Sequence, residues 1–194
     1  MKHRVITISR QFGSGGRTIG KEVAAKLGIP CYDRELIEMF ASESGFSEEY
    51  VRENSEHIMK KDWLSSILSD RVYDTPHTQD VLWDVQQKVI LELAQKGPCV
   101  IVGRGADYIL EGEVDCLRVF IHADAEKRAE RVVNRYGETD EPAMKRIADK
   151  DKRREAYYQQ YTGRQQGDAE NYHITLDSGV IGEETCIRIL TELY

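Results

Sequence analysis

The glycine-rich segment at residues 9–18 carries the residue types best suited to chemistry, because its composition matches a phosphate-binding loop. Glycines let the backbone turn sharply and point successive N–H groups inward, and a following helix adds the positive end of its dipole. The alternative is a glycine-rich turn that binds no ligand. We predict that phosphate groups bind at Gly13, Ser14, Gly15, Gly16, Arg17 and Thr18.

Two alignments of this segment with the standard phosphate loop, GxxxxGK[ST], are possible, and both depart from it. The standard Lys contacts the β- and γ-phosphates, and the hydroxyl binds magnesium. In the first register Gly16 is the last glycine, Arg17 replaces Lys and Thr18 supplies the hydroxyl. In the second, Gly13 and Gly15 match the inner glycines, Gly16 occupies the Lys position and Arg17 the Ser/Thr position. In both, Arg17 can bind a phosphate bidentately, although its planar guanidinium is not equivalent to an ammonium point charge.

Three further polar residues follow predicted strands. Arg104 stands between two glycines after residues 99–102, and Asp33 and Arg34 follow residues 31–32. Ligands of open parallel sheets bind beyond the carboxyl ends of the strands, so Arg104 is placed to reach a cleft and Asp33 to orient a substrate hydroxyl or magnesium. The alternatives are a surface or helix-capping role for Arg104 and a helix N-cap for Asp33.

A basic run lies within residues 137–168, a stretch rich in charge, Tyr and Gln and short of aliphatic residues. This composition predicts a poorly packed, mobile excursion in which Tyr157, Tyr158 and Tyr161 pack against the body of the protein. Phosphoryl transfer requires cations that a closing lid often delivers. A solvated helix face is the alternative to a lid. The basic residues are Lys145, Arg146, Lys150, Lys152, Arg153, Arg154 and Arg164.

The elements that must position these residues alternate between strands and helices. Apolar, β-branched runs predict buried strands at residues 4–9, 31–32, 99–102, 117–122 and 172–176. Helical patterns cover residues 18–27, 125–135 and 183–193, and they also run throughout residues 35–96, where a long helix opens at Thr78. This order predicts an α/β fold with a parallel sheet and right-handed crossovers.

The composition limits the function classes. The 27 basic and 34 acidic residues give a net charge of −7, which argues against nucleic-acid and membrane-surface partners. Four dispersed cysteines predict free thiols, and no apolar run is long enough for a signal peptide or a membrane span. A cytoplasmic protein is expected; the oligomeric state is left open.

Several stretches together resemble the cytidylate kinase-like family of P-loop proteins. They are ISRQFGSGGRTIGKEVAAKLGIPCYDRELI, CVIVGRGADYILEGEVDCLRVFIHADAEKRAERV, DKRREAYYQQYTG and NYHITLDSG, and they cover nearly the whole chain. The resemblance implies a single nucleoside-monophosphate-kinase-like domain with five parallel strands, a helical acceptor-binding insert at about residues 38–80 and a lid at about 137–168.

The same resemblance implies roles for individual residues. Arg17 and Thr18 would hold the phosphates of ATP and Mg²⁺, Arg104 the acceptor monophosphate, and Arg153 and Arg154 would be lid cations acting in catalysis. The chain departs from cytidylate kinases at the loop Lys, at the Asp that follows the Gly-Arg turn, and in its acceptor segment, which begins with Asp33 and Arg34.

These observations support three hypotheses. The first is an ATP- and Mg²⁺-dependent phosphotransferase whose small-molecule acceptor is a nucleotide, with CMP or dCMP the first choice. The second is a nucleotide-binding regulatory protein that lacks transfer activity, favoured by the missing Lys. The third is a kinase of a non-nucleotide metabolite, favoured by Asp33 and the altered acceptor region.

Overall fold

The fold is built on a five-stranded sheet in which every neighbouring pair is parallel. The computed structural model describes residues 5–33, 35–55, 76–137 and 141–194. The strand order is β2-β3-β1-β4-β5, which confirms the predicted parallel α/β sheet. The strands are β1 (Val5–Arg10), β2 (Cys31–Tyr32), β3 (Cys99–Val102), β4 (Cys116–His122) and β5 (Ile174–Asp177).

Two strands begin or end at other residues than the apolar runs predict, because pairing with the neighbouring strand sets their boundaries. β5 begins at Ile174 rather than at residue 172, because its register against β4 runs from Val119–Ile174 to His122–Asp177. β1 continues to Arg10, one residue beyond the predicted end, because Arg10 still pairs with Ile121. The predicted start of this strand, residue 4, lies outside the described residues.

One face of the sheet is covered by α1 and α10, which pack against each other beside the short helix α9. Val23 of α1 and Leu190 of α10 are fully buried there with Ile6 and Ile8 of the central strand. α1 starts two residues earlier than predicted, and α10 has the predicted bounds. The helices are α1 (Gly16–Leu27), α9 (Ser178–Ile181) and α10 (Glu183–Leu193).

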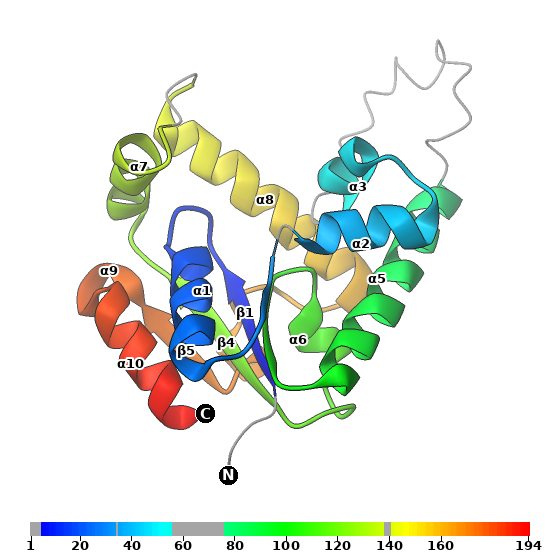
Figure 1. The fold of residues 1–194 in the computed structure, drawn as a ribbon. Helices are drawn as coiled ribbons and strands as arrows, with labels where there is room; N and C mark the ends of the chain where they lie inside the picture. Colours follow the sequence, from blue (N-terminus) through cyan, green and yellow to red (C-terminus); the bar gives the residue numbers. More distant parts are fainter. Residues whose placement is uncertain (1–4, 34, 56–75, 138–140) are drawn as a thin grey trace.

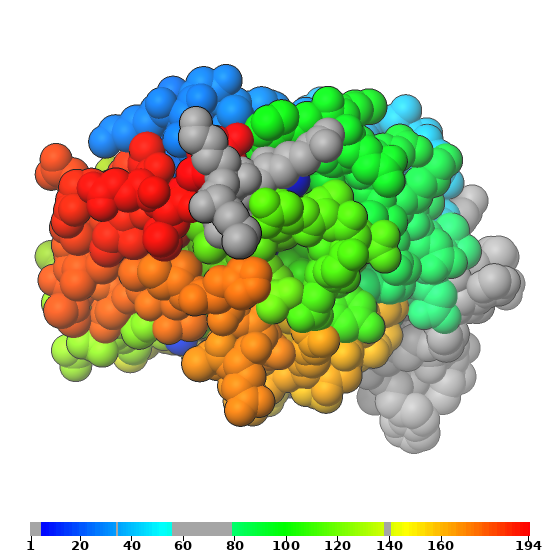
Figure 2. Space-filling view, turned by 90° about the horizontal axis from the view of Figure 1, so that it is seen from below, coloured from blue at the N-terminus to red at the C-terminus, as the bar shows by residue number. Residues whose placement is uncertain are grey.

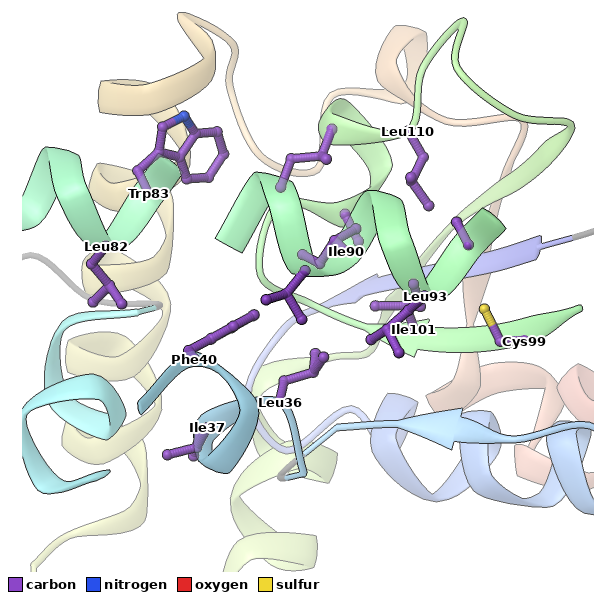
Figure 3. Packing of buried hydrophobic residues seen from close by; sticks show 14 of the residues in the cluster. Leu36, Ile37, Phe40, Leu82, Trp83, Ile90, Leu93, Cys99, Ile101 and Leu110 are labelled. Atoms are coloured by element: carbon purple, nitrogen blue, oxygen red, sulfur yellow. The ribbon is translucent and has the colours of Figure 1, made fainter. Parts of the chain in front are cut away.

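The other face is covered by four helices whose apolar residues form a second core with β3. Figure 3 shows Phe40 of α2, Ile90 of α5 and Ile101 of β3 pointing into the same interior. Within the predicted insert, residues 56–75 lie outside the described part. The helices are α2 (Glu35–Ser44), α3 (Glu48–Asn54), α5 (Pro76–Lys96) and α6 (Ala106–Ile109).

A long helix, α8 (Ala143–Thr162), crosses above the carboxyl ends of the strands from α7 (Ala125–Asn134) to α5 (Figure 1). The sequence predicts poor packing for this segment, yet Ile147, Tyr157 and Tyr158 of α8 are buried. The tyrosines pack against the body as predicted: Tyr161 stacks on Trp83 of α5 with ring centroids 4.7 Å apart. Mobility of this segment stays a prediction.

The end of the molecule from which the strands start lies opposite α8. Figure 2 shows it from below, with α10 in red on one side and α5 and the α6–β4 connection in green on the other. A 3-10 turn, η1 (Ala169–Asn171), precedes β5. No helix in the described ranges is both long and apolar enough to cross a membrane.

Candidate functional site

The site cavity has a volume of about 1000 Å³ and opens at the carboxyl ends of β1, β2 and β3, beneath α8. Of the predicted site residues, Ser14 belongs to the glycine-rich loop but is fully buried and does not line the cavity, and Arg34 lies outside the described residues. The remaining predicted residues all line it: Gly13, Gly15, Gly16, Arg17, Thr18, Asp33, Arg104, Arg153 and Arg154.

The glycine-rich loop (residues 11–15) joins β1 to α1 and lies tightly against its neighbours. Gly13 and Gly15 have φ angles of 80° and 81°, in the left-handed region that favours glycine. A Cβ on Gly13 would lie 2.9 Å from the carbonyl oxygen of Arg128, and one on Gly15 would lie 2.5 Å from Oε1 of Glu183. Both positions therefore require glycine.

Hydrogen bonds from outside the loop hold its carbonyl groups. Nη1 of Arg128 donates to the Phe12 carbonyl at 3.1 Å, and Nη1 of Arg131 donates to the Gly13 carbonyl at 2.7 Å. These bonds fix the direction of the peptide units. The N–H groups in the first turn of α1 have no partners within the helix, so they could donate to an anion at the loop.

The start of α1 favours the second of the two loop registers. Gly15 is the N-cap of α1 in a left-handed conformation, and Gly16 is the first helical residue. Gly15 therefore has the conformation required of the last loop glycine, which leaves Gly16 at the Lys position and Arg17 at the Ser/Thr position. Thr18, the predicted magnesium ligand, then stands one residue beyond the standard hydroxyl position.

Arg17 forms an ion pair with Asp33 across the mouth of the cavity, Nε to Oδ2. The Arg17 side chain is 37% exposed and that of Asp33 only 9%, so the pair lies at the boundary between cavity and solvent. The backbone N–H of Asp33 donates to Oε2 of Glu35 at 3.2 Å. The carboxylate of Asp33 thus connects the α1 side of the cavity with the end of β2.

Arg104 reaches the cavity from a turn of three consecutive left-handed residues. Its φ is 63°, between Gly103 at 75° and Gly105 at 65°, and it is the one non-glycine with positive φ within the described ranges. Its guanidinium is buried and donates to the hydroxyl of Ser55 at the end of α3. A conformation this costly persists where surrounding structure enforces it, most often at functional sites.

α8 contributes Lys150, Arg153 and Arg154 to the cavity. Arg154 is buried, and its guanidinium carbon lies 5.7 Å from the centre of the Phe12 ring, within range of a cation–π contact. Arg153 is exposed at the rim. Lys145, Arg146, Lys152 and Arg164 of the basic run do not line the cavity.

Asp151 ties α8 to the glycine-rich loop, a contact that the sequence pattern did not reveal. Its Oδ1 accepts the Phe12 backbone N–H at 2.7 Å, and its Oδ2 pairs with Nη1 of Arg128 on α7. Arg131, one turn after Arg128, pairs with Glu183 of α10 at 3.1 Å. The spacing of Arg128 and Arg131 predicts a shared helix face, but only the fold brings that face to the loop.

The site cavity is locally basic in an acidic protein, because its seven cations outnumber its four carboxylates. This balance suits a polyanionic ligand such as a nucleotide phosphate chain. Mg²⁺ is commonly held by one or two carboxylates together with substrate phosphates, and Asp33 and Thr18 offer suitable oxygen atoms. The cations are Arg10, Arg17, Arg52, Arg104, Lys150, Arg153 and Arg154. The carboxylates are Asp33, Glu38, Glu48 and Glu53.

The chain is similar over most of its length to several known proteins. The profile of the cytidylate kinase-like family matches residues 5–180. The cytidylate kinase of Methanopyrus kandleri is 28% identical over 195 residues, which cover 96% of this chain and 90% of that protein. The cytidylate kinase of Pyrobaculum aerophilum is 25% identical over 188 residues, covering 95% of this chain and 89% of the relative.

Solved structures of other proteins have the same architecture. A protein of Eubacterium ventriosum described as uncharacterized superposes with a TM-score of 0.70 at 26% identity, over 97% of this chain and 96% of that one. A shikimate kinase from Acinetobacter baumannii, in complex with shikimate, gives a TM-score of 0.55 at 14% identity, over 99% and 93% of the two chains. The second likeness shows the fold alone.

Proposed function

Because the chain belongs to the cytidylate kinase-like family, we propose that it transfers the γ-phosphate of ATP, with Mg²⁺, to a nucleoside monophosphate, with CMP or dCMP the first acceptors to test. The family and the kinase folds among its structural neighbours support a kinase of a nucleotide or another small molecule. The finer assignment rests on one observation. A single cavity joins the glycine-rich loop, the Arg104 turn and the cations of α8.

The proposed reaction depends on positioning and charge neutralisation, without a covalent intermediate. The loop N–H groups and Arg17 hold the donor phosphates, and Arg104 holds the phosphate of the acceptor. Arg153 and Arg154 neutralise the oxygens of the transferring group, while α8 covers the cavity and limits the access of water. Bound Mg²⁺, held by Thr18 and Asp33, would further neutralise the phosphate oxygens.

The missing loop Lys is the feature that most affects this proposal. Gly16 carries no side chain at the Lys position, and Arg17 is paired with Asp33. Lys150, Arg153 and Arg154 approach from α8 instead and line the same cavity. We propose that these cations of α8 take over the contact with the β- and γ-phosphates.

Two alternatives are each favoured by a specific observation. A nucleotide-binding protein without transfer activity is favoured by the engagement of Arg17 with Asp33 in the absence of a Lys at residue 16. A kinase of a non-nucleotide metabolite is favoured by the carboxylates at the acceptor side, because carboxylates bind the hydroxyl groups of a polyol well. Three of these carboxylates lie on α2 and α3: Glu38, Glu48 and Glu53.

Arg17→Ala separates a kinase from a binding protein. In a kinase, the variant loses turnover much more than ATP affinity, roughly tenfold or more in kcat, because negative charge grows during transfer on the donor phosphates that Arg17 holds. In a binding protein, affinity alone falls. Turnover is measured as ADP release over a panel of nucleoside monophosphates and small hydroxyl compounds, and affinity by calorimetry with a non-hydrolysable ATP analogue.

Arg188→Ala is the matched control, since Arg188 pairs with Glu192 on the exposed face of α10, away from the cavity. It should leave turnover and affinity unchanged. If the wild-type protein binds nucleotide while no acceptor in the panel turns over, the transfer proposal is wrong and the binding protein takes its place.

A further inference from the structure

Three elements that adjoin or carry the proposed phosphate-binding residues meet at one buried carboxyl group, that of Asp107: β1 leads into the glycine-rich loop, α6 follows the Arg104 turn, and α8 carries Arg153 and Arg154. Asp107 lies in the first turn of α6 and is only 2% exposed. The hydroxyl of Ser9 on β1 donates to its Oδ1 at 3.0 Å, and the hydroxyl of Tyr158 on α8 donates to its Oδ2 at 2.7 Å. Each carboxyl oxygen is therefore held by a different element.

Ser9, Asp107 and Tyr158 each lie within four residues, along the sequence, of a residue that lines the site cavity. Ser9 precedes Arg10, the last residue of β1, and Asp107 lies three residues after Arg104. Tyr158 lies four residues after Arg154, so the two side chains share one face of α8 at successive turns. A shift of Tyr158 relative to Asp107 would therefore carry the Arg154 guanidinium with it.

Burying the Asp107 carboxyl group costs desolvation free energy, which indicates that its hydrogen bonds have a role beyond filling space. Burial raises the pKa of the Asp107 carboxyl, against the opposing effect of the bonds from Tyr158 and Ser9. Apolar side chains would fill the same space without that desolvation cost. A fully satisfied polar cluster instead fixes one relative arrangement of the elements that supply it.

We propose that Asp107 is a positioning residue that sets α8, and with it Arg154, relative to the glycine-rich loop and the Arg104 turn. It acts through the hydroxyls of Tyr158 and Ser9 and does not line the cavity itself. The part of Arg154 in phosphoryl transfer rests on the proposed function. The coupling of α8 to the loop does not, so the two can be tested separately.

The test compares Tyr158→Phe with Tyr157→Phe. Tyr157 is the neighbouring buried residue, and its hydroxyl accepts a hydrogen bond from Nε2 of Gln86 on α5 at 2.8 Å. Both variants lose one buried hydroxyl from the same helix, but only Tyr158→Phe removes a bond to Asp107. The first readout is amide hydrogen exchange of the protein without ligand, which needs no assumption about the reaction.

We expect Tyr158→Phe to speed exchange roughly tenfold in the glycine-rich loop and in residues 143–154 of α8. Tyr157→Phe should change exchange only in α5 and the last turns of α8. Equal patterns in the two variants, or a Tyr158→Phe effect confined to its own helical turn, would overturn the proposal and leave a purely structural bond.

Turnover supplies the second readout. Tyr158→Phe should lower kcat roughly ten- to a hundredfold with little change in acceptor KM, because misplaced cations act on the transferring group more than on the bound acceptor. Asp107→Asn keeps one acceptor oxygen and should retain more activity than Asp107→Ala. Should the wild-type protein transfer no phosphate, the proposed function fails, while the exchange comparison still decides the positioning role.

Discussion

Arg104 has a left-handed backbone conformation, which only glycine adopts without strain. The residues on both sides of it, Gly103 and Gly105, are glycines that also have positive φ angles. A left-handed φ costs a residue with a Cβ about 1–2 kcal/mol. The turn packs closely against α5, because a Cβ on Gly105 would lie 3.0 Å from the Trp83 ring. The strained residue is thus also the one whose guanidinium contacts Ser55 and lines the cavity.

This strain predicts a difference between two substitutions at residue 104. Arg104→Ala and Arg104→Gly both remove the guanidinium, and both should raise the acceptor KM at least tenfold while ATP affinity stays the same. Arg104→Gly should be more stable than Arg104→Ala by about 1 kcal/mol, because glycine adopts the left-handed region freely. Urea unfolding of the two variants measures this difference. Equal stability would show that the turn is not strained.

At the level of residues, the sequence predicts which residues are candidates for the site better than it predicts which other residues they contact. The glycine-rich loop and Arg104 stand out because glycines beside a buried apolar run mark a turn at the end of a strand. The ion pair between Arg17 and Asp33 does not stand out, because their separation in sequence has no helical or strand periodicity. It arises because β2 places Asp33 beside the start of α1.

At the level of elements, the glycine-rich loop is held by α7, α8 and α10 as well as by its own glycines. Arg128, Arg131 and Asp151 bond to its backbone, and Glu183 of α10 lies directly against Gly15. The loop is therefore held in one conformation, so the proposed binding of phosphate would require little further ordering.

Gly15→Ala tests this packing, with Gly112→Ala as its control. Both glycines have similar φ angles, 81° and 78°, so both variants should lose about 1 kcal/mol of stability from backbone strain. A Cβ on Gly112 meets nothing within 4 Å, whereas one on Gly15 overlaps Glu183. Only Gly15→Ala should then lose affinity for an ATP analogue in calorimetry. Unchanged affinity in Gly15→Ala would contradict a phosphate cradle at the loop.

Most elements could be predicted from apolar periodicity, but their packing could not. The charged, aliphatic-poor composition of residues 137–168 predicts loose structure, because it offers few apolar side chains to bury. α8 packs instead through aromatic rings and buried polar groups, such as Tyr158 on Asp107 and Tyr161 on Trp83. Their partners lie on α5 and α6, far away in sequence, so no local pattern reveals the contact.

At the scale of the whole molecule, several buried or half-buried thiol and phenol groups make the stability of the fold fall at alkaline pH. Burial is the main cause that raises the pKa of Cys31 and of Cys116 to about 11 and that of Tyr161 to about 12. Burial also raises the pKa of Tyr158 and of Tyr172. The folded protein holds these protons more tightly than the unfolded chain does, so the unfolded chain releases them first.

The stability that these groups contribute is therefore fully present below about pH 9 and is lost as the pH rises through about 11. We expect the free energy of unfolding in urea to fall steeply across this window. Replacing Cys31 and Cys116 together with Ser, which does not titrate there, should make the fall shallower. A free energy of unfolding that stays level across the window would show that the fold does not raise the pKa values of these groups.

The fold brings three separately encoded features into one basic cavity: the loop after β1, the turn after β3 and the cations of α8. A protein that only binds a nucleotide would need the first of these alone. The combination is what favours transfer of a phosphoryl group between two ligands over the binding of one.

The most direct test of this claim follows the phosphoryl group itself. The protein is incubated with Mg²⁺, with CMP or dCMP, and with ATP whose γ-phosphate is labelled with an oxygen isotope. The masses of the products are then measured by mass spectrometry. We predict one labelled diphosphate for each ADP formed, and a sharp loss of that product in Arg104→Ala. Unlabelled acceptor in the presence of bound ATP, or ADP formed with the label only in free phosphate, would contradict the proposed transfer to a nucleoside monophosphate.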